Sequence, residues 1–136
     1  MEYWLFIINN EVSVFKKRIE SKEWPIYDKT SFRKNLRAGD YILFYKAGVN
    51  DAQKFVGKAR IAAQPKAVTD TLVYNLKIKD VSVWEKCPSI RDYLTKLSFI
   101  KDERNWGIYL QGGVKRLTKQ EYSMLTRKAE RMNEKN

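Results

Sequence analysis

The side chains of this sequence that could do chemistry are aromatic rings, amides and cations. The chain contains four Trp, eight Tyr and six Phe residues, and its 27 Lys and Arg outnumber its 16 Asp and Glu, which gives a formal net charge of +11. Aromatic planes stack on bases, and Lys and Arg neutralise phosphates. This combination predicts a protein that binds nucleic acid.

The groups that most enzymes use are missing from the sequence. Without histidine there is no Ser–His or Cys–His nucleophile system, and the single Cys87 cannot build a thiolate cage for a metal. Neither a Walker loop nor a Gly-x-Gly-x-x-Gly sequence occurs. Carboxylate chemistry and a Ser–Lys pair stay open, because either can assemble in space. The sequence therefore favours binding over catalysis, with no metal and no cofactor.

The positive charge is spread along the chain and is not confined to a tail. Residues 114–136 carry seven Lys or Arg and three Asp or Glu, a net charge of +4, which leaves +7 for residues 1–113. A basic tail alone would indicate a nonspecific arm. The spread favours a charged face that attracts a polyanion, with a bland, highly soluble surface as the alternative.

Length and composition predict one soluble domain over residues 1–136. No apolar run approaches the roughly 20 residues of a membrane-spanning helix, and the first run is too short for a signal peptide. A single cysteine agrees with a reducing compartment. We therefore expect a cytoplasmic protein without a membrane partner. The oligomeric state stays open, with a monomer favoured.

Strand patterns dominate the first two thirds of the chain. The unbroken apolar runs at residues 3–8 and 41–45 predict central strands covered on both faces. Residues 55–61 predict the returning strand of a hairpin, in which Gly57 marks a bulge or a close backbone approach. Further on, alternation over residues 72–78 changes phase, which predicts a bulge near Lys79 and Asp80.

Short helices are expected between these strands. The first follows Asn9 or Asn10 and ends before Trp24-Pro25, because proline disfavours helical geometry at the residue before it. A second begins at Thr30, where apolar residues share a helical face.

The last third predicts a helix from Ser89, a strand over residues 106–110 and a terminal helix. The terminal helix spans about residues 119–130, capped by Thr118 with Glu121 and followed by a frayed tail. With five to six strands in all, the chain is expected to form an α+β fold, a mixed β-barrel flanked by short helices.

Some of the aromatic residues are candidates for a binding pocket. Trp24 lies between a helix and Pro25, where a large ring need not be core, so we favour a pocket position for it. Tyr45 or Phe99 would supply the opposite wall. Asn9 would provide the bidentate amide that reads the edge of a flipped base.

A segment of small and basic residues, Gln111-Gly112-Gly113-Val114-Lys115-Arg116, could bring backbone N–H groups and two cations to a phosphate. A β-turn followed by a solvated basic edge explains the same residues equally well. The expected phosphate-binding rim consists of Lys46, Lys58, Gln111, Lys115 and Arg116.

In their order and spacing, these residues resemble the EVE domain family of the PUA-like superfamily, which is related to the YTH readers of methylated adenine. The resemblance covers nearly the whole chain. It is carried by Tyr3-Trp4, Ile8-Asn9, Glu23-Trp24-Pro25, Arg37-Ala38-Gly39-Asp40, Tyr45, Phe55-Val56-Gly57, Tyr74-x-Leu76-Lys77-Ile78 and Arg116-Leu117-Thr118, and most specifically by residues 97–101 and 106–112.

The resemblance implies a PUA-like β-barrel with a pocket for a modified base. Trp24 matches the YTH cage tryptophan, and Asn9 or Asn10 matches the pocket asparagine. Pro25-Ile26 stands where EVE sequences often have Gly-Val, which reshapes the rim. The implied function is recognition without turnover, in which one unpaired or extruded base stacks on Trp24 while the basic rim holds phosphates.

Two other functions stay open at this stage. One is a small-molecule or nucleotide-binding domain of the same fold, and the other is an accessory protein to a nucleic-acid-modifying enzyme. The sequence does not distinguish RNA from DNA, and it does not identify the modification.

Overall fold

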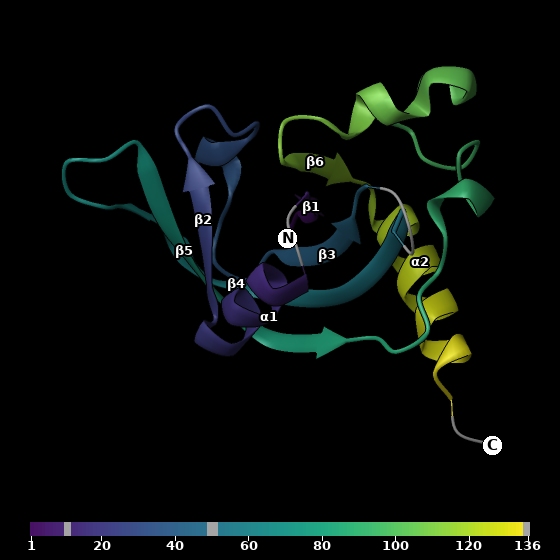
Figure 1. Cartoon of the computed structure of the whole chain (residues 1–136), viewed down its shortest axis with the longest axis horizontal. Helices are drawn as coiled ribbons and strands as arrows, with labels where there is room; N and C mark the ends of the chain where they lie inside the picture. The colour runs from purple at the N-terminus through teal and green to yellow at the C-terminus, as the bar shows by residue number, and fades with distance from the viewer. Residues whose placement is uncertain (10–11, 49–51, 135–136) are drawn as a thin grey trace.

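The computed structural model of the protein describes residues 1–9, 12–48 and 52–134 (Figure 1). In chain order, α-helices (α), strands (β) and 3-10 helices (η) alternate. Their bounds are β1 Tyr3–Ile8, α1 Val12–Ser21, β2 Glu23–Tyr27, η1 Arg33–Asn35, β3 Tyr41–Lys46, β4 Lys54–Ala67, β5 Val73–Val83, η2 Ile90–Asp92, η3 Glu103–Leu110, β6 Val114–Leu117 and α2 Lys119–Met132.

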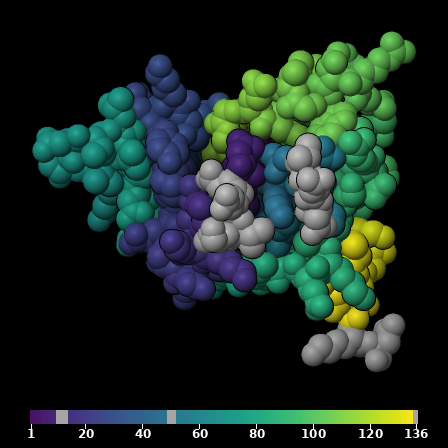
Figure 2. Space-filling model, viewed as in Figure 1, coloured from purple at the N-terminus to yellow at the C-terminus, as the bar shows by residue number. Residues whose placement is uncertain are grey.

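The six described strands form one curled sheet in the order β2-β5-β4-β3-β1-β6. β1 and β3 run parallel, and the other neighbouring pairs run antiparallel. The segments beside the two edge strands meet where the Ser31 N–H donates to the Gly112 carbonyl at 3.2 Å. On one side the β4–β5 hairpin projects from the body next to β2 (Figures 1 and 2). The predicted α+β fold with a mixed, barrel-like sheet is confirmed.

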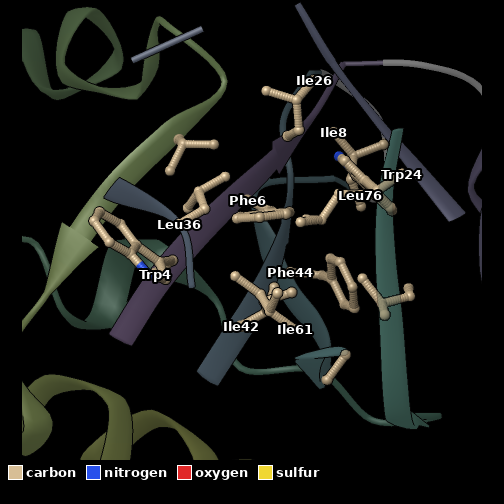
Figure 3. Close-up of a cluster of buried hydrophobic side chains, with 13 residues drawn as sticks. Trp4, Phe6, Ile8, Trp24, Ile26, Leu36, Ile42, Phe44, Ile61 and Leu76 are labelled. Carbon is tan, nitrogen blue, oxygen red and sulfur yellow. The ribbon is translucent and has the colours of Figure 1, made fainter. Parts of the chain in front are cut away.

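Two hydrophobic cores lie on the two faces of the sheet, and β1 and β3 contribute to both. Successive side chains of a strand point to opposite faces. Trp4 and Phe44 therefore lie in the first core, which Figure 3 shows, whereas Leu5 and Tyr45 lie in the second. The prediction that both apolar runs are strands covered on two faces is confirmed.

One α-helix packs against each core (Figure 1). Phe15 and Ile19 of α1 pack against the first core, and Tyr122 and Leu125 of α2 lie in the second. Among the residues that the structure describes, no helix is long and apolar enough to cross a bilayer.

The start of α2 is the predicted capping box. The Thr118 N–H donates to Glu121 Oε1 at 2.8 Å, and the Glu121 N–H donates to Thr118 Oγ1 at 3.1 Å. Glu121 is buried, and its carboxylate also accepts from the Ser98 N–H at 2.5 Å. The cap therefore holds both the helix and the segment that precedes η3.

The two predicted irregularities of the sheet occur in the structure. At Gly57 the backbones approach so closely that a Cβ would lie 2.5 Å from the Ser82 carbonyl oxygen, and the β3–β4 register shifts opposite it. Asp80 has a φ of +52°, and the β4–β5 register shifts between Lys58 and Arg60. These bulges let the long β4–β5 ribbon curl.

The strand predicted at residues 106–110 is wrong, because these residues belong to the 3-10 helix η3. Asp102 caps its start by accepting a hydrogen bond from the Arg104 N–H at 3.0 Å. Trp106 and Tyr109, three residues apart, pack against the second core, whereas Ile108 is 59% exposed. The helical spacing of these half-buried rings therefore prevails over the strand-like composition.

The helices predicted from Ser89 and Thr30 are also wrong in extent. Ser89 Oγ accepts from the Arg91 N–H at 3.3 Å, and only the 3-10 turn η2 follows. Before η1, Phe32 has a φ of +62°, so no longer helix can begin at Thr30.

Trp24-Pro25 does not form the irregular break that the sequence indicates. α1 ends at Ser21, Lys22 turns the chain with a φ of +58°, and both residues lie in β2. Proline is tolerated there because β2 is an edge strand, where a missing N–H costs no central ladder bond.

A buried carboxylate fixes the start of β1 to the turn before β3. Asp40 is 2% exposed and accepts three hydrogen bonds, from Trp4 Nε1 at 2.9 Å and from the N–H groups of Arg37 and Glu2 at 3.1 Å each. Without the Asp40 carboxylate, these three donors would be partly or fully buried with no acceptor, which is costly.

We expect Asp40→Asn to lower the free energy of unfolding by about 2–4 kcal/mol, because the amide turns a donor toward N–H groups. Asp70→Asn is the control, since Asp70 is exposed and Asn tolerates its φ of +60°. Urea unfolding of both variants measures the difference. Equal stabilities would contradict a structural role for Asp40.

Candidate nucleic-acid interface

The two edge strands of the sheet face each other across a hollow of about 410 Å³, which we call the seam pocket. Its wall on the β2 side begins with Trp24 and Pro25, and its opposite wall includes Gly112 and Gly113. Asn9 lies between the walls, directly after β1, and is exposed. The full lining is Ile7, Asn9, Arg18, Trp24, Pro25, Ile26, Tyr27, Lys29, Thr30, Gly112, Gly113 and Val114.

The polar groups of the seam pocket suit an anionic ligand. Arg18 and Lys29 line it, and no carboxylate occurs among its described lining residues. The Asn9 amide offers both donors and an acceptor, and Thr30 adds a hydroxyl. These groups can bind and orient a ligand, but none of them is a carboxylate or an imidazole that could act as a general base.

Trp24 belongs to the first core and to the pocket at once. The indole is 4% exposed, and Phe44 stacks on it with ring centroids 5.0 Å apart and planes at 28°. Phe15 meets it edge-on at 6.2 Å. Trp24 therefore lines the seam pocket while its ring is packed in the first core, and its contact with a ligand stays a prediction.

The guanidinium of Arg18 covers the Trp24 ring, with Cζ 4.7 Å from the ring centroid. Burial lowers the pKa of Arg18, and the neighbouring Tyr27 hydroxyl partly opposes this shift. Arg18 also lines a second hollow of about 440 Å³ toward the β4–β5 hairpin, which includes Val73 and Tyr74. Arg18 thus stands between two spaces.

The glycine pair fits the wall because of its backbone. Gly112 and Gly113 have φ values of +94° and +81°, a region that other residues rarely adopt. A Cβ on Gly112 would lie 2.6 Å from Ser31 Oγ. The Gly113 carbonyl accepts from the Ile7 N–H at 2.8 Å, which holds the turn against β1.

A third hollow, of about 350 Å³, adjoins the seam pocket and shares Asn9 and Gly112 with it; we call it the side pocket. Tyr45, Trp106 and Gln111 are among its lining residues. Burial raises the pKa of Tyr45 to about 12. Because Tyr45 is buried, the exposed Asn9 and Gln111 supply the polar contacts of the side pocket.

The structure does not place Tyr45 or Phe99 opposite Trp24, so this expectation is wrong. Phe44 shares the face of the sheet with Trp24, and Tyr45, one residue further on, points into the second core. Phe99 is half-buried against that second core. Asn10, the remaining pocket candidate, lies outside the described residues.

The residues expected to form one phosphate-binding rim lie apart. Lys58 Nζ pairs with Glu130 Oε1 of α2 at 2.8 Å, and Lys46 lines a hollow beside α1. The Arg116 guanidinium lies over the rings of Trp4 and Phe32. Lys115 is half-buried on β6. Gln111 alone of the five lines one of the two adjoining pockets.

The most apolar hollow, about 450 Å³, lies between α1 and the ends of β4 and β5, and we call it the apolar pocket. Phe15, Val56, Val83 and Trp84 line it, with Lys46 among the polar residues at its side. The sequence did not predict this pocket. The apolar alternation along β5 changes phase before Val83, and this was a signal that the end of the strand presents its apolar side chains to the other face.

Sequence reasoning also missed the cations of the seam pocket. Arg18 lies outside the apolar stripe of α1 and looks like a solvated charge. It reaches Trp24 because the turn at Lys22 folds the last turn of α1 alongside β2. Lys29 follows β2 and is exposed, so its position depends on how the sheet curls.

The curled mixed sheet with one helix on each core is the PUA-like fold. The sequence pattern of the EVE domain family matches residues 2–125. The chain belongs to the EVE domain family. No curated protein sequence matches the chain.

Solved structures share this fold at low sequence identity. Protein Atu2648 from Agrobacterium tumefaciens is 20% identical, with a TM-score of 0.67, over 95% of this chain and 93% of that one. Human THYN1, solved in complex with DNA containing 5-methylcytosine, is 11% identical, with a TM-score of 0.63, over 100% and 99% of the two chains. The YTH domain of MmI1 is 14% identical, with a TM-score of 0.61, over 97% of each.

We expect Gly112→Ala to lower the free energy of unfolding by about 1–3 kcal/mol, because of its positive φ and the contact with Ser31. Gly107→Ala is the matched control, since a Cβ there meets nothing within 4 Å. That variant should be neutral or slightly stabilising. Thermal and urea unfolding compare the two, and an equal effect of both changes would contradict the strain argument.

Proposed function

We propose that this protein is a non-catalytic nucleic-acid-binding module that takes one modified base into the seam pocket. The observation that carries the proposal is the combination in one hollow of an indole ring, an exposed amide and two cations, with no carboxylate among the described lining residues. The aromatic and apolar groups suit a base, and the cations suit the phosphates on either side of it.

The base would come from an unpaired or extruded nucleotide. Asn9 would pair with its hydrogen-bonding edge, because an amide presents a donor and an acceptor side by side. Pro25 and Trp24 would contact the base and its apolar substituent. A methyl or hydroxymethyl group in such a contact contributes about 1–3 kcal/mol of discrimination.

Phosphate binding would then use different cations from those that the sequence suggested. Arg18 and Lys29 lie at the pocket itself. Gln111, which lines the adjoining side pocket, would add a polar contact. Because such contacts release counterions, affinity should fall as salt rises.

The family and its structural neighbours support this proposal. Human THYN1 has the same fold and was solved with DNA that contains 5-methylcytosine. The YTH domain of MmI1 also has this fold. The choice between RNA and DNA, and the modification itself, are the variables of the test.

Asn9→Ala should weaken binding of the preferred modified oligonucleotide by about tenfold, because the side chain is exposed at the pocket and its loss leaves the core intact. Trp24→Ala is unsuitable, since removing a buried Trp costs about 3–5 kcal/mol of stability. Asn35→Ala in η1, also exposed and outside the pocket, is the control.

The measurement is fluorescence anisotropy with labelled single-stranded DNA and RNA that carry unmodified, methylated or hydroxymethylated bases, at two salt concentrations. A preference for one modified base that Asn9→Ala abolishes supports the proposal. If wild type binds all probes alike, or if Asn9→Ala binds like wild type, the seam pocket does not read a base.

The apolar pocket supports a second candidate function, the binding of a small and mainly apolar molecule. Its volume lies in the range of ligand sites, and Phe15 and Trp84 provide aromatic contact. Lys16, Glu20 and Lys46 also line it, so the ligand would combine an apolar body with a polar end, as an aromatic carboxylic acid does.

Val83→Glu tests this candidate, because Val83 is 55% exposed at the pocket and a glutamate there would occupy space and repel an anionic ligand. Val68→Glu, 44% exposed and outside the pocket, is the control. In a titration with aromatic carboxylic acids monitored by Trp fluorescence, Val83→Glu alone should lose affinity by about tenfold or more. Absence of saturable binding to wild type would exclude this class of ligand.

A further inference from the structure

The position of Arg18 bears on how a base reaches Trp24. One side of the Trp24 ring packs on Phe44 within the first core. The Arg18 guanidinium lies over the ring at 4.7 Å, and the indole is 4% exposed. A base therefore cannot stack on this ring while the guanidinium stays where it is.

Arg18 is held there by a weak and replaceable contact. No carboxylate of a described residue lies within 4 Å of its guanidinium in an ion pair. Burial at this position lowers the pKa of Arg18, which shows that its charge is partly desolvated. A planar cation over an indole gains cation–π attraction of a size similar to base stacking, so the two can exchange.

The side chain also has somewhere to go. Arg18 lines the seam pocket on one side and, on the other, the hollow next to Val73 and Tyr74. Arginine binds phosphate through two parallel N–H groups, a stronger contact than cation–π attraction in water. A strand that delivers a base to the seam pocket brings its phosphates to the same place.

We propose that Arg18 occupies the stacking position on Trp24 in the unbound protein and is exchanged for the base when a phosphate of the same strand draws the guanidinium away. This inference rests on the proposed function of the seam pocket. It deepens that function by naming how the pocket opens, which requires a phosphate on the same strand as the base. A free base or nucleoside offers nothing to the displaced cation and binds poorly.

The test compares two probes that carry the same modified base, the free nucleoside and a single-stranded hexanucleotide. Arg18→Ala should bind the nucleoside about three- to fivefold more tightly than wild type, because the competing cation is gone. The same variant should bind the hexanucleotide about threefold or more weakly, with the slope of log affinity against log salt reduced by about one.

Lys17→Ala is the matched control, since Lys17 is an exposed cation on the same helix that does not line the pocket. It should leave nucleoside binding unchanged. Arg18→Met separates the two roles of the side chain, because a thioether still covers the ring but cannot bind phosphate. That variant should lose hexanucleotide affinity without any gain for the nucleoside.

A second measurement follows the guanidinium directly. The NMR signal of Arg18 Nε–H should show the ring-current shift of Trp24 in the free protein and lose it when the hexanucleotide binds. If Arg18→Ala weakens the nucleoside or leaves it unchanged, or if the shifted signal persists in the complex, the exchange is overturned. If instead Asn9→Ala leaves both probes unaffected, the proposed function of the pocket has failed, and this inference falls with it.

Discussion

The structure depends on the burial of two parallel strands on both of their faces. β1 and β3 are hydrogen-bonded to each other and to β6 and β4 on their outer sides, and their side chains alternate between two cores. A shift of either strand by one residue in register would move large rings such as Trp4 and Phe44 to the opposite face of the sheet. Because the pair is fixed, the ends of the two strands are fixed as well.

The binding hollows are a consequence of where those ends lie. Asn9 follows the last residue of β1 and belongs to both the seam pocket and the side pocket. Tyr45, near the end of β3, lines the side pocket from within the second core. A ligand in these spaces therefore meets groups whose positions are set by the two strands that are buried on both faces. The cations Arg18 and Lys29 come from α1 and from the turn after β2, outside that strand pair.

The fold was predictable because its strongest signals are local or periodic. The two apolar runs, the phase change before Val81 and the capping box of α2 each report a backbone state directly. Residues 106–110 misled because strand and 3-10 helix compete closely in a short aromatic segment. In this segment the secondary structure is decided by the packing of Trp106 and Tyr109 against the second core, whose residues are mostly far away in the sequence.

The site was only partly predictable, for a related reason. Asn9, Trp24 and Pro25, the base-pocket candidates from the sequence, line one hollow, and the glycine pair, a candidate for a phosphate contact, lines it too. Which ring faces which, however, depends on strand parity and on sheet curl, so the pairing of Trp24 with Tyr45 or Phe99 could not be tested from the sequence. Arg18 and Lys58 carry the same charge in the sequence, yet one covers an indole and the other pairs with Glu130.

Pro25 has a consequence that reaches beyond the pocket. It lies in β2, one of the two strands at which the hydrogen-bonded sheet ends, and it has no N–H to donate outward. β2 therefore cannot zip continuously onto β6 to complete the barrel, and it cannot readily accept a strand from a neighbouring molecule. The missing N–H thus removes a donor that closure onto β6 would use, and the same donor is missing for edge-to-edge growth into a larger sheet.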